Sequence, residues 1–327
     1  MSRKLKIAML IDAWFPFYGG GQVHIKNLTK LLKKNNNCNI ELFYAGRSNI
    51  LFRFFWSLIA TFQVITHHKK RKFDLIHSHA HIAGLSGIIL SKILKIPVIH
   101  TVHGSALLDQ KTISPKAWLE KFLLTKIKYN AQITVSKNFL VHPNVNHNIT
   151  IIPNGVDVSQ FDRVKVKKSK NPRIIWVGRD DPVKGLKYLK TAILKVRKKI
   201  PHLETELVTG GRLTGKDLIA AYKRSHVFVL SSLAEGQPIT LLEAWAAKLP
   251  VAVTSVGDNP DMVKNNINGI LVEPANARQL ADSILKILRS KKRAKQMGIE
   301  GHNLVKKYYS WENVANKTHQ VYQSLLK

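Results

Sequence analysis

We predict an α/β protein with two doubly wound parallel-sheet domains, and three observations favour this class. The chain has 327 residues, 45% of them hydrophobic, which is enough for two cores of ordinary size. The short apolar segment Val227–Leu230 is typical of a strand buried on both faces of a parallel sheet. A helical segment, 239–247, follows after a loop, with Pro238 where a first helical turn tolerates it. Such a loop lies at the carboxyl end of a strand, where open α/β sheets bind ligands.

The remaining segments follow the same alternation of strand and helix. Residues 1–158 are predicted to form the first domain, 159–172 a lysine-rich linker, 173–308 the second domain and 309–327 an amphipathic C-terminal helix. Strands are predicted at 7–11, 40–45, 73–79, 96–104 with its exit loop, 131–135, 149–152, 173–177, 203–208, 227–230 and 250–254. Helices are predicted at 22–34, 51–66, 116–128, 216–224, 239–247, 277–290 and 293–307.

The composition limits the partners and the compartment. A net charge of +32 favours polyanions or an anionic membrane surface, and a solvated lysine-rich surface is the alternative. Nucleic acid is a rival partner, but the sequence has no zinc spacing and no basic-aromatic stripe of the expected kinds. The one cysteine, Cys38, excludes a disulfide framework and suits a reducing compartment. Asp12 ends the first apolar run, which therefore reads as a strand and not as a signal peptide.

Two acidic residues, Glu235 and Glu243, flank the junction between the apolar strand and its helix. Glu243 lies about one turn into the helix, so both carboxylates can point at one ligand over the helix start. Residues 237–240 at this start offer backbone N–H groups and the positive end of the helix dipole, which favour an anion. Carboxylates beside a phosphate site suit a nucleotide sugar, because they accept hydrogen bonds from sugar hydroxyls. A capping carboxylate with a solvated mid-helix glutamate is the alternative.

The segment 231–244 reads Ser-x-x-x-Glu-Gly-x-Pro-x-x-x-x-Glu-Ala and resembles the signature of the retaining family 4 glycosyltransferases of GT-B fold. The resemblance implies two Rossmann-like domains that face a central cleft, with the donor on the second domain and the acceptor on the first. It also implies that Glu235 is catalytic and binds sugar hydroxyls, and that the C-terminal helix crosses back to the first domain. The donor-binding residues that it implies are Gly20, Gly21, Arg179, Lys184, Gly236, Gln237, Pro238, Ile239, Thr240 and Glu243, the last for the ribose.

Three further segments carry this resemblance. Arg179 and Lys184 resemble the family's two cations that grip the diphosphate, where fixed positive charge offsets the charge gained by the leaving nucleotide. Gly20 and Gly21 follow the first strand, where glycines let a ligand approach the backbone; a flexible turn is the alternative. His103 ends a strand at the cleft side, and the resemblance makes it a catalytic residue that meets the sugar and the acceptor.

The segment Asp-x-Ile-His-x-His contributes three closely spaced histidines, His77, His79 and, just beyond it, His81. On a continued strand they would share one face, as a metal site requires. The run resembles a family segment that is not a metal site, and no Asp-x-Asp pair holds a divalent ion beside the predicted phosphates. We therefore expect no metal and no cofactor other than the donor substrate.

The chain departs from the family after residues 203–208. Where the family has a further βα unit, residues 209–215 lead almost directly into the next helix. The missing turn commonly contacts the nucleobase, so the sequence assigns neither the base nor the sugar, and a degenerate enzyme is left open.

The helix at 51–66 is apolar on more than one side. Helical spacing predicts as its core face Leu51, Phe54, Phe55, Leu58, Phe62 and Ile65. On another side lie Phe52, Trp56 and Ile59, with basic residues at 69–72 just beyond. This second side is suited to a membrane interface, and cover by a neighbouring helix is the alternative.

The sequence thus predicts a transferase that moves a hexose from a nucleoside-diphosphate sugar, with retention and without metal, to a lipid-linked or cell-envelope glycan acceptor such as lipopolysaccharide. We expect a cytoplasmic protein, peripheral on the inner face of the membrane, with no specific nucleic-acid partner. The alternative is a catalytically decayed GT-B scaffold that binds polyanions or anionic membrane.

Overall fold

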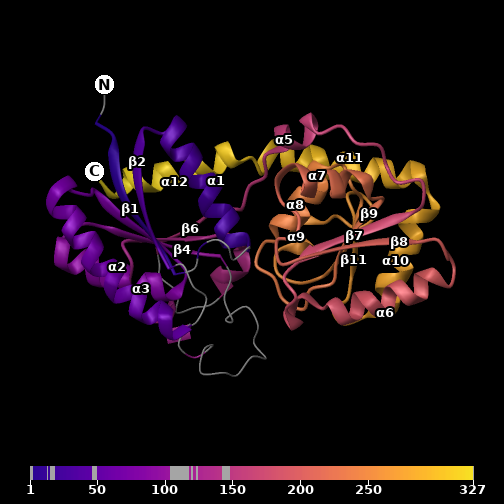
Figure 1. Cartoon of the computed structure of the whole chain (residues 1–327), viewed down its shortest axis with the longest axis horizontal. Helices are drawn as coiled ribbons and strands as arrows, with labels where there is room; N and C mark the ends of the chain where they lie inside the picture. Colours follow the sequence, from indigo (N-terminus) through magenta and orange to yellow (C-terminus); the bar gives the residue numbers. More distant parts are fainter. Residues whose placement is uncertain are drawn as a thin grey trace. The chain divides into compact units, whose positions relative to one another are not determined.

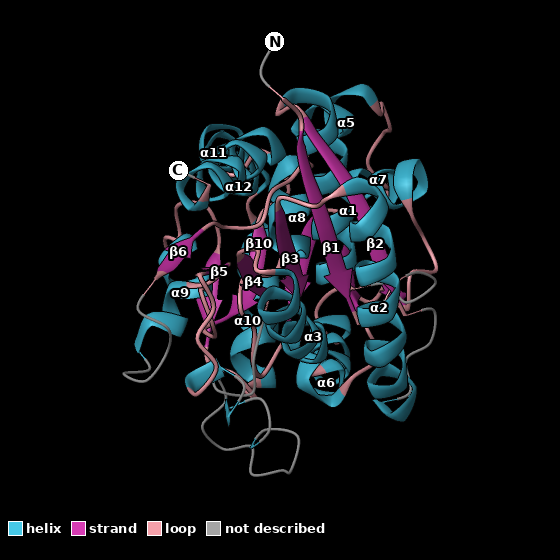
Figure 2. Ribbon diagram, turned by 90° about the vertical axis from the view of Figure 1, so that its left-hand side faces the viewer, coloured by secondary structure: helices cyan, strands magenta, loops and turns pink. Residues whose placement is uncertain are grey.

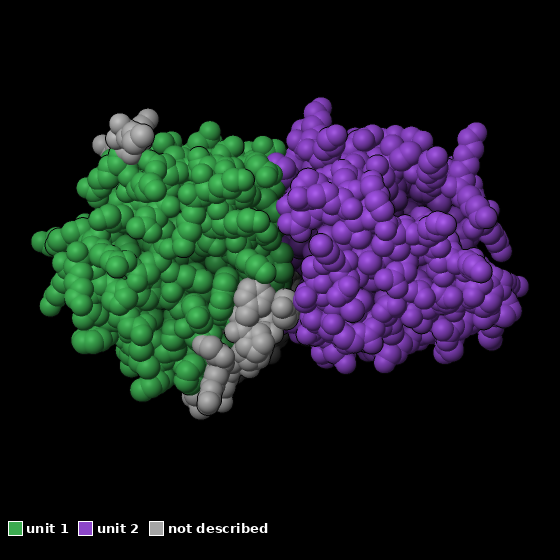
Figure 3. Space-filling model, turned by 45° about the horizontal axis from the view of Figure 1, so that its top comes forward, with its two compact units in different colours: residues 1–153, 311–327 green, residues 154–310 purple. Residues whose placement is uncertain are grey.

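The computed structural model describes residues 3–12, 14, 19–45, 50–103, 118, 121–122, 124–141 and 148–326. The chain divides into two compact units, shown in different colours in Figure 3. Unit 1 comprises residues 1–153 and 311–327, and unit 2 comprises residues 154–310. Of the predicted helix at 116–128, the structure describes residues 118, 121–122 and 124–128, and those at 118, 121–122 and 124–125 are helical.

Unit 1 is a parallel sheet with helices on both faces (Figure 1). Its six described strands are ordered β2-β1-β3-β4-β5-β6. They are β1 (Leu5–Ile11), β2 (Cys38–Tyr44), β3 (Leu75–His79), β4 (Val98–Val102), β5 (Ala131–Thr134) and β6 (Ile149–Ile151). The helices are α1 (Gly20–Asn35), α2 (Ile50–Arg71), α3 (His81–Leu94), the short 3-10 helix η2 (Lys137–Val141) and α12 (Trp311–Leu325).

Alternation along β1 and β3 divides the core of unit 1 between the two faces of the sheet. Ala8, Leu10 and Ile76 pack in one cluster with buried side chains of α2 and α3. On the other face, His77 hydrogen-bonds through Nδ1 to the Tyr322 hydroxyl at 2.6 Å, so α12 is part of this unit. The helix pair α2 and α3 can be followed in Figure 2.

Unit 2 is a five-stranded parallel sheet ordered β11-β10-β9-β7-β8. Its strands are β7 (Arg173–Gly178), β8 (Glu204–Thr209), β9 (Val227–Leu230), β10 (Val251–Thr254) and β11 (Ile270–Val272). The helices are α5 (Val158–Arg163), η3 (Pro182–Lys184), α6 (Leu186–Arg197), α7 (Gly215–Arg224), α8 (Ile239–Ala246), α9 (Asn259–Met262), α10 (Ala277–Arg289) and α11 (Lys291–Tyr308). Two parallel sheets flanked by helices confirm the predicted α/β class.

The strand order of unit 2 shows what the short connection after β8 does to the sheet. A doubly wound sheet has the strand order 3-2-1-4-5-6. In unit 2, β7 corresponds to strand 1 of this order and β8 to strand 2. The chain then runs through α7 to β9 on the far side of β7, so the third strand is missing from the continuous range 154–310. Charged pairs line the edge strand β8, including Arg173 Nε with Glu204 Oε2 at 2.7 Å.

The segment predicted as a linker instead packs on unit 2. Phe161 of α5 is 5% exposed and belongs to the core of this unit, so helix 158–163 is structural. Farther along, Lys168 Nζ donates to the Ser225 carbonyl at 2.5 Å, and Ser169 N donates to the Arg224 carbonyl at 2.9 Å. Residues 159–172 contain few apolar side chains, so the sequence did not predict this packing. The single buried ring of Phe161 is enough to hold the helix on unit 2.

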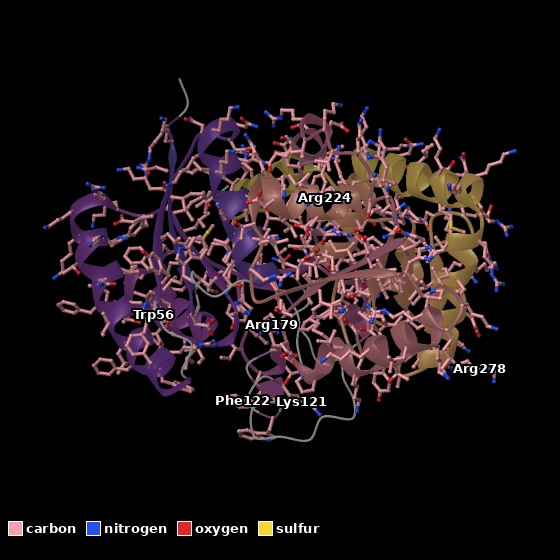
Figure 4. All side chains as sticks on the ribbon, turned by 45° about the vertical axis from the view of Figure 1, so that its right-hand side comes forward. Trp56, Lys121, Phe122, Arg179, Arg224 and Arg278 are labelled. Atoms are coloured by element: carbon pink, nitrogen blue, oxygen red, sulfur yellow. The ribbon has the colours of Figure 1, made fainter. Side chains whose placement is uncertain are left out.

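Most of the predicted core face of α2 is wrong, although Ile65 is half-buried against the core as predicted. Trp56 (labelled in Figure 4) is only 5% exposed and packs in the core with Ala60 and Val64. Phe54, Phe55, Leu58 and Phe62, predicted as the core face, are instead exposed. Ile59 is exposed, Phe52 is half-buried against the core, and the side chain of Leu51 lies outside what the structure describes. None of the described helices is long and apolar enough to cross a membrane.

Candidate active site

The predicted donor residues of unit 2 follow two neighbouring strands. Strand β8 lies on one side of β7 and β9 on the other, so the chain changes direction in the sheet between β7 and β9. Ligands of open α/β sheets bind outside the carboxyl ends of strands at such a point. Lys184 follows β7 and Glu235 follows β9, and Lys184 Nζ donates to Glu235 Oε1 at 2.7 Å. The structure thus brings together two residues that are 51 positions apart in the sequence.

Hydrogen bonds between residues 183–184 of η3 and residues 231–233 of the loop after β9 hold Lys184 in place. We call this connection the strap. Leu233 N donates to the Val183 carbonyl at 2.7 Å, and Ser231 Oγ donates to the Lys184 carbonyl at 3.0 Å. Gly185 has a φ of +60°, and a Cβ there would lie 2.0 Å from the Ser231 carbonyl oxygen. Only glycine permits this close approach, which seats the Lys184 backbone against the loop after β9.

The Glu235 carboxylate is almost buried, with 8% of its side chain exposed. Its Oε1 accepts from Lys184 and also from Ser232 Oγ, at 2.6 Å. The loop after β10 packs on the Glu235 backbone, because a Cβ at Gly257 would lie 2.3 Å from the Glu235 carbonyl oxygen. Lys184 and Ser232 therefore fix the orientation of this carboxylate, and the loop after β10 restrains the Glu235 backbone.

Arg179 is placed differently from Lys184. It follows β7 directly, its side chain is 62% exposed, and Nη2 lies 3.6 Å from Asp181 Oδ2 (Figure 4 labels Arg179). Asp181 also accepts from Val183 N and begins η3. Arg179 is therefore a solvent-facing cation at the end of the same strand, and its ion pair with Asp181 leaves the guanidinium accessible to a ligand.

The predicted anion site at residues 237–240 is more restricted than expected. Pro238 has no N–H and precedes the first residue of α8, so only the other amides of this segment can donate. Gln237 is buried, and its side-chain oxygen accepts from Asn154 N while its carbonyl accepts from Asn154 Nδ2. The Gln237 side chain thus anchors the loop to Asn154 within unit 2. Ile239 is buried and Thr240 half-buried at the helix start.

Glu243 lies in the middle of α8 and is half-buried. The Tyr222 hydroxyl of α7 donates to Glu243 Oε2 at 2.9 Å. Burial raises the pKa of the Glu243 carboxyl to about 7, although the Tyr222 hydrogen bond acts in the opposite direction. This carboxyl can therefore carry a proton near neutral pH and serve as a donor as well as an acceptor.

The predicted residues of unit 1 also gather where the strand order turns, between β1 and β3. Gly20 and Gly21 are the first two residues of α1, and a Cβ at Gly21 would lie 3.6 Å from His103 Cδ2. His103 Nε2 lies 3.1 Å from His79 Nδ1, and the two rings stack. The His24 ring meets the His103 ring edge-on, with 4.7 Å between centroids.

The histidines at the end of β3 are packed as neutral side chains. His77 is fully buried between the Tyr322 hydroxyl and Thr101 Oγ1, with its Nε2 2.7 Å from the latter. Burial, reinforced by neighbouring histidines, holds the pKa of His77 and of His79 well below the usual value. The side chain of His81 lies outside the described residues. Within the described part of the chain, no three histidine, cysteine or acidic side chains are placed to hold a metal ion.

Several residues of the two clusters escaped the sequence prediction. Ser232 stands three positions before Glu235, a spacing at which a hydroxyl can reach a carboxylate, and this signal was available. Asn154 lies in a turn far from Gln237 in the sequence, which gives no local signal for their contact. Tyr222 carries no local signal for its role, and the spacing that singled out His79 does not predict its contact with His103, because each meets its partner only through the packing of separate elements.

Comparison with known families agrees with this arrangement. Residues 18–160 match the family described as Glycosyltransferase Family 4, and residues 202–304 match the one described as Glycosyl transferases group 1. A UDP-Gal:alpha-D-GlcNAc-diphosphoundecaprenol alpha-1,3-galactosyltransferase of Escherichia coli is 28% identical over 302 residues, covering 77% of this chain and 76% of that protein. An uncharacterised glycosyltransferase of Methanocaldococcus jannaschii, MJ1178, is 27% identical over 97% of this chain and 98% of its own length.

Solved structures share the fold. Sucrose-phosphate synthase from Thermosynechococcus elongatus has a TM-score of 0.82 at 18% identity, covering 98% of this chain and 99% of that one. Anabaena HepE in complex with UDP-glucose has a TM-score of 0.75 at 15% identity, covering 98% and 100%. The matched families and relatives identify this two-unit α/β chain as a glycosyltransferase of GT-B fold that acts on nucleotide sugars. The chain belongs to the family 4 glycosyltransferases.

Proposed function

We propose that this protein transfers a hexose from a nucleoside-diphosphate sugar, with retention of configuration, to a lipid-linked or cell-envelope glycan acceptor such as a lipopolysaccharide precursor. The main support for the proposal is the contact of Lys184 with Glu235. It lies at the carboxyl ends of β7 and β9, where the order of strands in unit 2 changes direction. A cation and a carboxylate at one strand edge can bind the diphosphate and the hexose of a single donor.

In this reaction the bond between the anomeric carbon and the diphosphate oxygen breaks, and its electron pair stays on the diphosphate. Lys184 and Arg179 offset that charge, together with the amides of Gly236, Ile239 and Thr240 at the start of α8. Glu235 Oε2 accepts from sugar hydroxyls, since both described contacts of this carboxylate use Oε1. Glu243 binds the ribose.

The acceptor oxygen then bonds to the anomeric carbon, and its proton leaves with the diphosphate. We assign His103, with Gly20 and Gly21, to the sugar and the acceptor. Cations and amides supply the charge stabilisation in this scheme, so we propose that catalysis needs no metal and that EDTA leaves turnover unchanged.

The E. coli relative is described as acting on a diphosphoundecaprenol-linked sugar, which supports a lipid-linked acceptor. We propose that the enzyme works in the cytoplasm, at the inner face of the membrane. The alternative of a decayed, polyanion-binding scaffold is not favoured, because Glu235 and Lys184 of the family signature are both present and in contact.

A donor screen by thermal shift, followed by turnover, tests the proposal. UDP-galactose and UDP-glucose are the first candidates, and NMR of the product reports whether configuration is retained. We expect Lys184→Met to weaken the donor-induced shift and to reduce turnover at least 100-fold, whereas Lys190→Met, an exposed cation of α6, leaves both unchanged. If no nucleotide sugar raises the melting temperature or is turned over, the proposal is wrong.

A further inference from the structure

The exposed side of α2 is apolar, although its buried side already supplies the core contact of this helix. Phe55, Leu58 and Phe62 are 61%, 68% and 70% exposed. With 100° per residue, these side chains and the exposed Phe54 and Ile59 cover one continuous arc opposite Trp56, Ala60 and Val64. A helix that is apolar all round is normally buried on every side or immersed in lipid. The described residues of unit 1 do not cover this outer arc.

The neighbouring helix α3 extends this surface. Ser57 Oγ of α2 and Ser86 Oγ of α3 are 2.5 Å apart, which places the two helices side by side (Figure 2). On α3, Ile89 and Ile93 are 40% and 54% exposed, and their spacing of four residues puts them on one face. We call this set the α2–α3 face: Phe54, Phe55, Leu58, Ile59, Phe62, Ile89 and Ile93.

The charges that α2, α3 and the segment between them carry are predominantly basic. Residues 50–95 contain one acidic residue, Asp74, which is already paired with Arg3. The same stretch contains seven basic residues: Arg53, Lys69, Lys70, Arg71, Lys72, Lys92 and Lys95. The cations at 69–72 and Lys92 and Lys95 are exposed. A second copy of this face would carry the same charge and be repelled, whereas an anionic lipid surface attracts both the apolar and the basic groups.

We propose that the α2–α3 face is the surface by which this protein binds an anionic lipid bilayer, with α2 lying in the plane of the interface. The phenylalanine and leucine side chains enter the boundary between headgroups and acyl chains. The lysines and Arg71 contact the headgroup phosphates. This assignment rests on the proposed function in one respect, because an enzyme with a lipid-linked acceptor has a reason to bind a membrane. The evidence for the contact itself is the exposure of the apolar side chains and the positive charge beside them.

Vesicle co-sedimentation tests the face directly. The full chain should bind vesicles that contain phosphatidylglycerol and bind vesicles of phosphatidylcholine alone at least ten times more weakly. We expect the triple variant Phe55→Ser, Leu58→Ser, Phe62→Ser to lose at least ten-fold in affinity for the anionic vesicles. Leu194→Ser is the matched control, because Leu194 is 63% exposed among the lysines of α6, and it should bind like the wild type. The exposed positions leave the core untouched, which an unchanged melting temperature verifies.

A fluorescent variant and a sizing measurement exclude the other occupants. Phe62→Trp should show a blue-shifted emission on anionic vesicles and quenching by brominated lipids, whereas Leu194→Trp should show neither. Wild-type binding by the triple variant, or no quenching at residue 62, would overturn the proposal. The proposal would also be overturned if the wild-type protein formed a concentration-dependent dimer in the absence of vesicles and the triple variant did not. These readouts need no donor, so a failed donor screen and a failed membrane contact are told apart.

Discussion

The carboxyl group of Glu243 has a pKa that depends on how the protein buries it. Burial raises this pKa from an ordinary value of 4.5 to about 7, so folding favours the protonated form. The stabilisation from burying a neutral carboxyl is complete below about pH 4.5. This stabilisation is lost as the pH rises through 7, because Glu243 then ionises and the folded protein must bury a charged carboxylate.

We therefore predict that Glu243→Gln stabilises the protein at pH 8 and not at pH 5. Glutamine keeps the shape and can accept from the Tyr222 hydroxyl, but it carries no charge at either pH. The expected gain at pH 8 is on the order of 2 kcal/mol, within the limit of about 1.4 kcal/mol per unit of pKa. Thermal unfolding at both pH values measures it. Glu273→Gln, on an exposed side chain, should show no such difference, and an equal effect of both variants would contradict the assignment.

The hydrogen bond between His79 and His103 leads to a prediction about turnover. Both rings point one nitrogen at the other, so a neutral His79 fixes which nitrogen of His103 carries the proton. Replacing His79 with phenylalanine keeps the bulk but removes this partner. We expect kcat to fall by roughly ten-fold, the worth of about 1.4 kcal/mol, with little change in KM for the donor.

His79→Asn separates positioning from packing, because its amide can replace the Nδ1 contact. This variant should recover part of the lost kcat although it fills the space less well. Equal kcat for the phenylalanine and asparagine variants would show that His79 acts only as a core residue.

Among the elements, the strap from η3 to the loop after β9 is the most sensitive to a small change. A methyl group at Gly185 would collide with the Ser231 carbonyl, whereas a Cβ at Gly210 meets nothing within 4 Å. Both glycines have φ near +60°, so Gly210→Ala carries the backbone strain alone.

We expect Gly210→Ala to cost about 1 kcal/mol and Gly185→Ala at least about 3 kcal/mol, because only the latter also forces the strap apart. Turnover should follow the same order, since the displaced Lys184 loses its contact with Glu235. Chemical unfolding and initial rates give both quantities. Similar losses for the two variants would mean that the strap does not position Lys184.

The sequence predicts an element well when its apolar pattern is compatible with only one structure and one buried face. Strand β9 and helix α8 are found almost to the residue, because an apolar run and a proline at a helix start allow little else. Helix α2 has two apolar arcs, and helical spacing cannot say which one the sheet covers. The choice of Trp56, Ala60 and Val64 as the buried arc is made by neighbours on β1, β3 and α3, which are distant in sequence.

The same distinction applies to the candidate site. The order of parallel strands predicts that the segments after β7 and β9 meet, and Lys184 and Glu235 do. It cannot predict that the Gln237 side chain turns to Asn154, or that Arg179 pairs with Asp181 in solvent. The first depends on a partner 83 positions away in the sequence, and the second on a choice between ion pair and solvent that the local pattern does not fix.

For the molecule as a whole, the path of the chain makes the two units unequal. Unit 2 is one continuous stretch, 154–310, and both of its buried clusters lie inside it. Unit 1 is completed only by α12, which buries Trp311, Val314 and Tyr322. Tyr322 also supplies the hydrogen bond to the buried His77, which would otherwise lose a partner.

We therefore predict that a fragment of residues 154–310 folds cooperatively on its own, whereas a fragment of residues 1–153 does not. Loss of α12 removes several large buried side chains and one buried hydrogen bond, together more than the few kcal/mol by which a domain of this size is stable. Circular dichroism during heating measures both fragments. A peptide of residues 311–326 should restore a cooperative transition to the 1–153 fragment by mass action, and the same peptide with Tyr322→Ala should do so poorly. A 1–153 fragment that unfolds cooperatively without the peptide would show that α12 is an accessory to unit 1 and no part of its core.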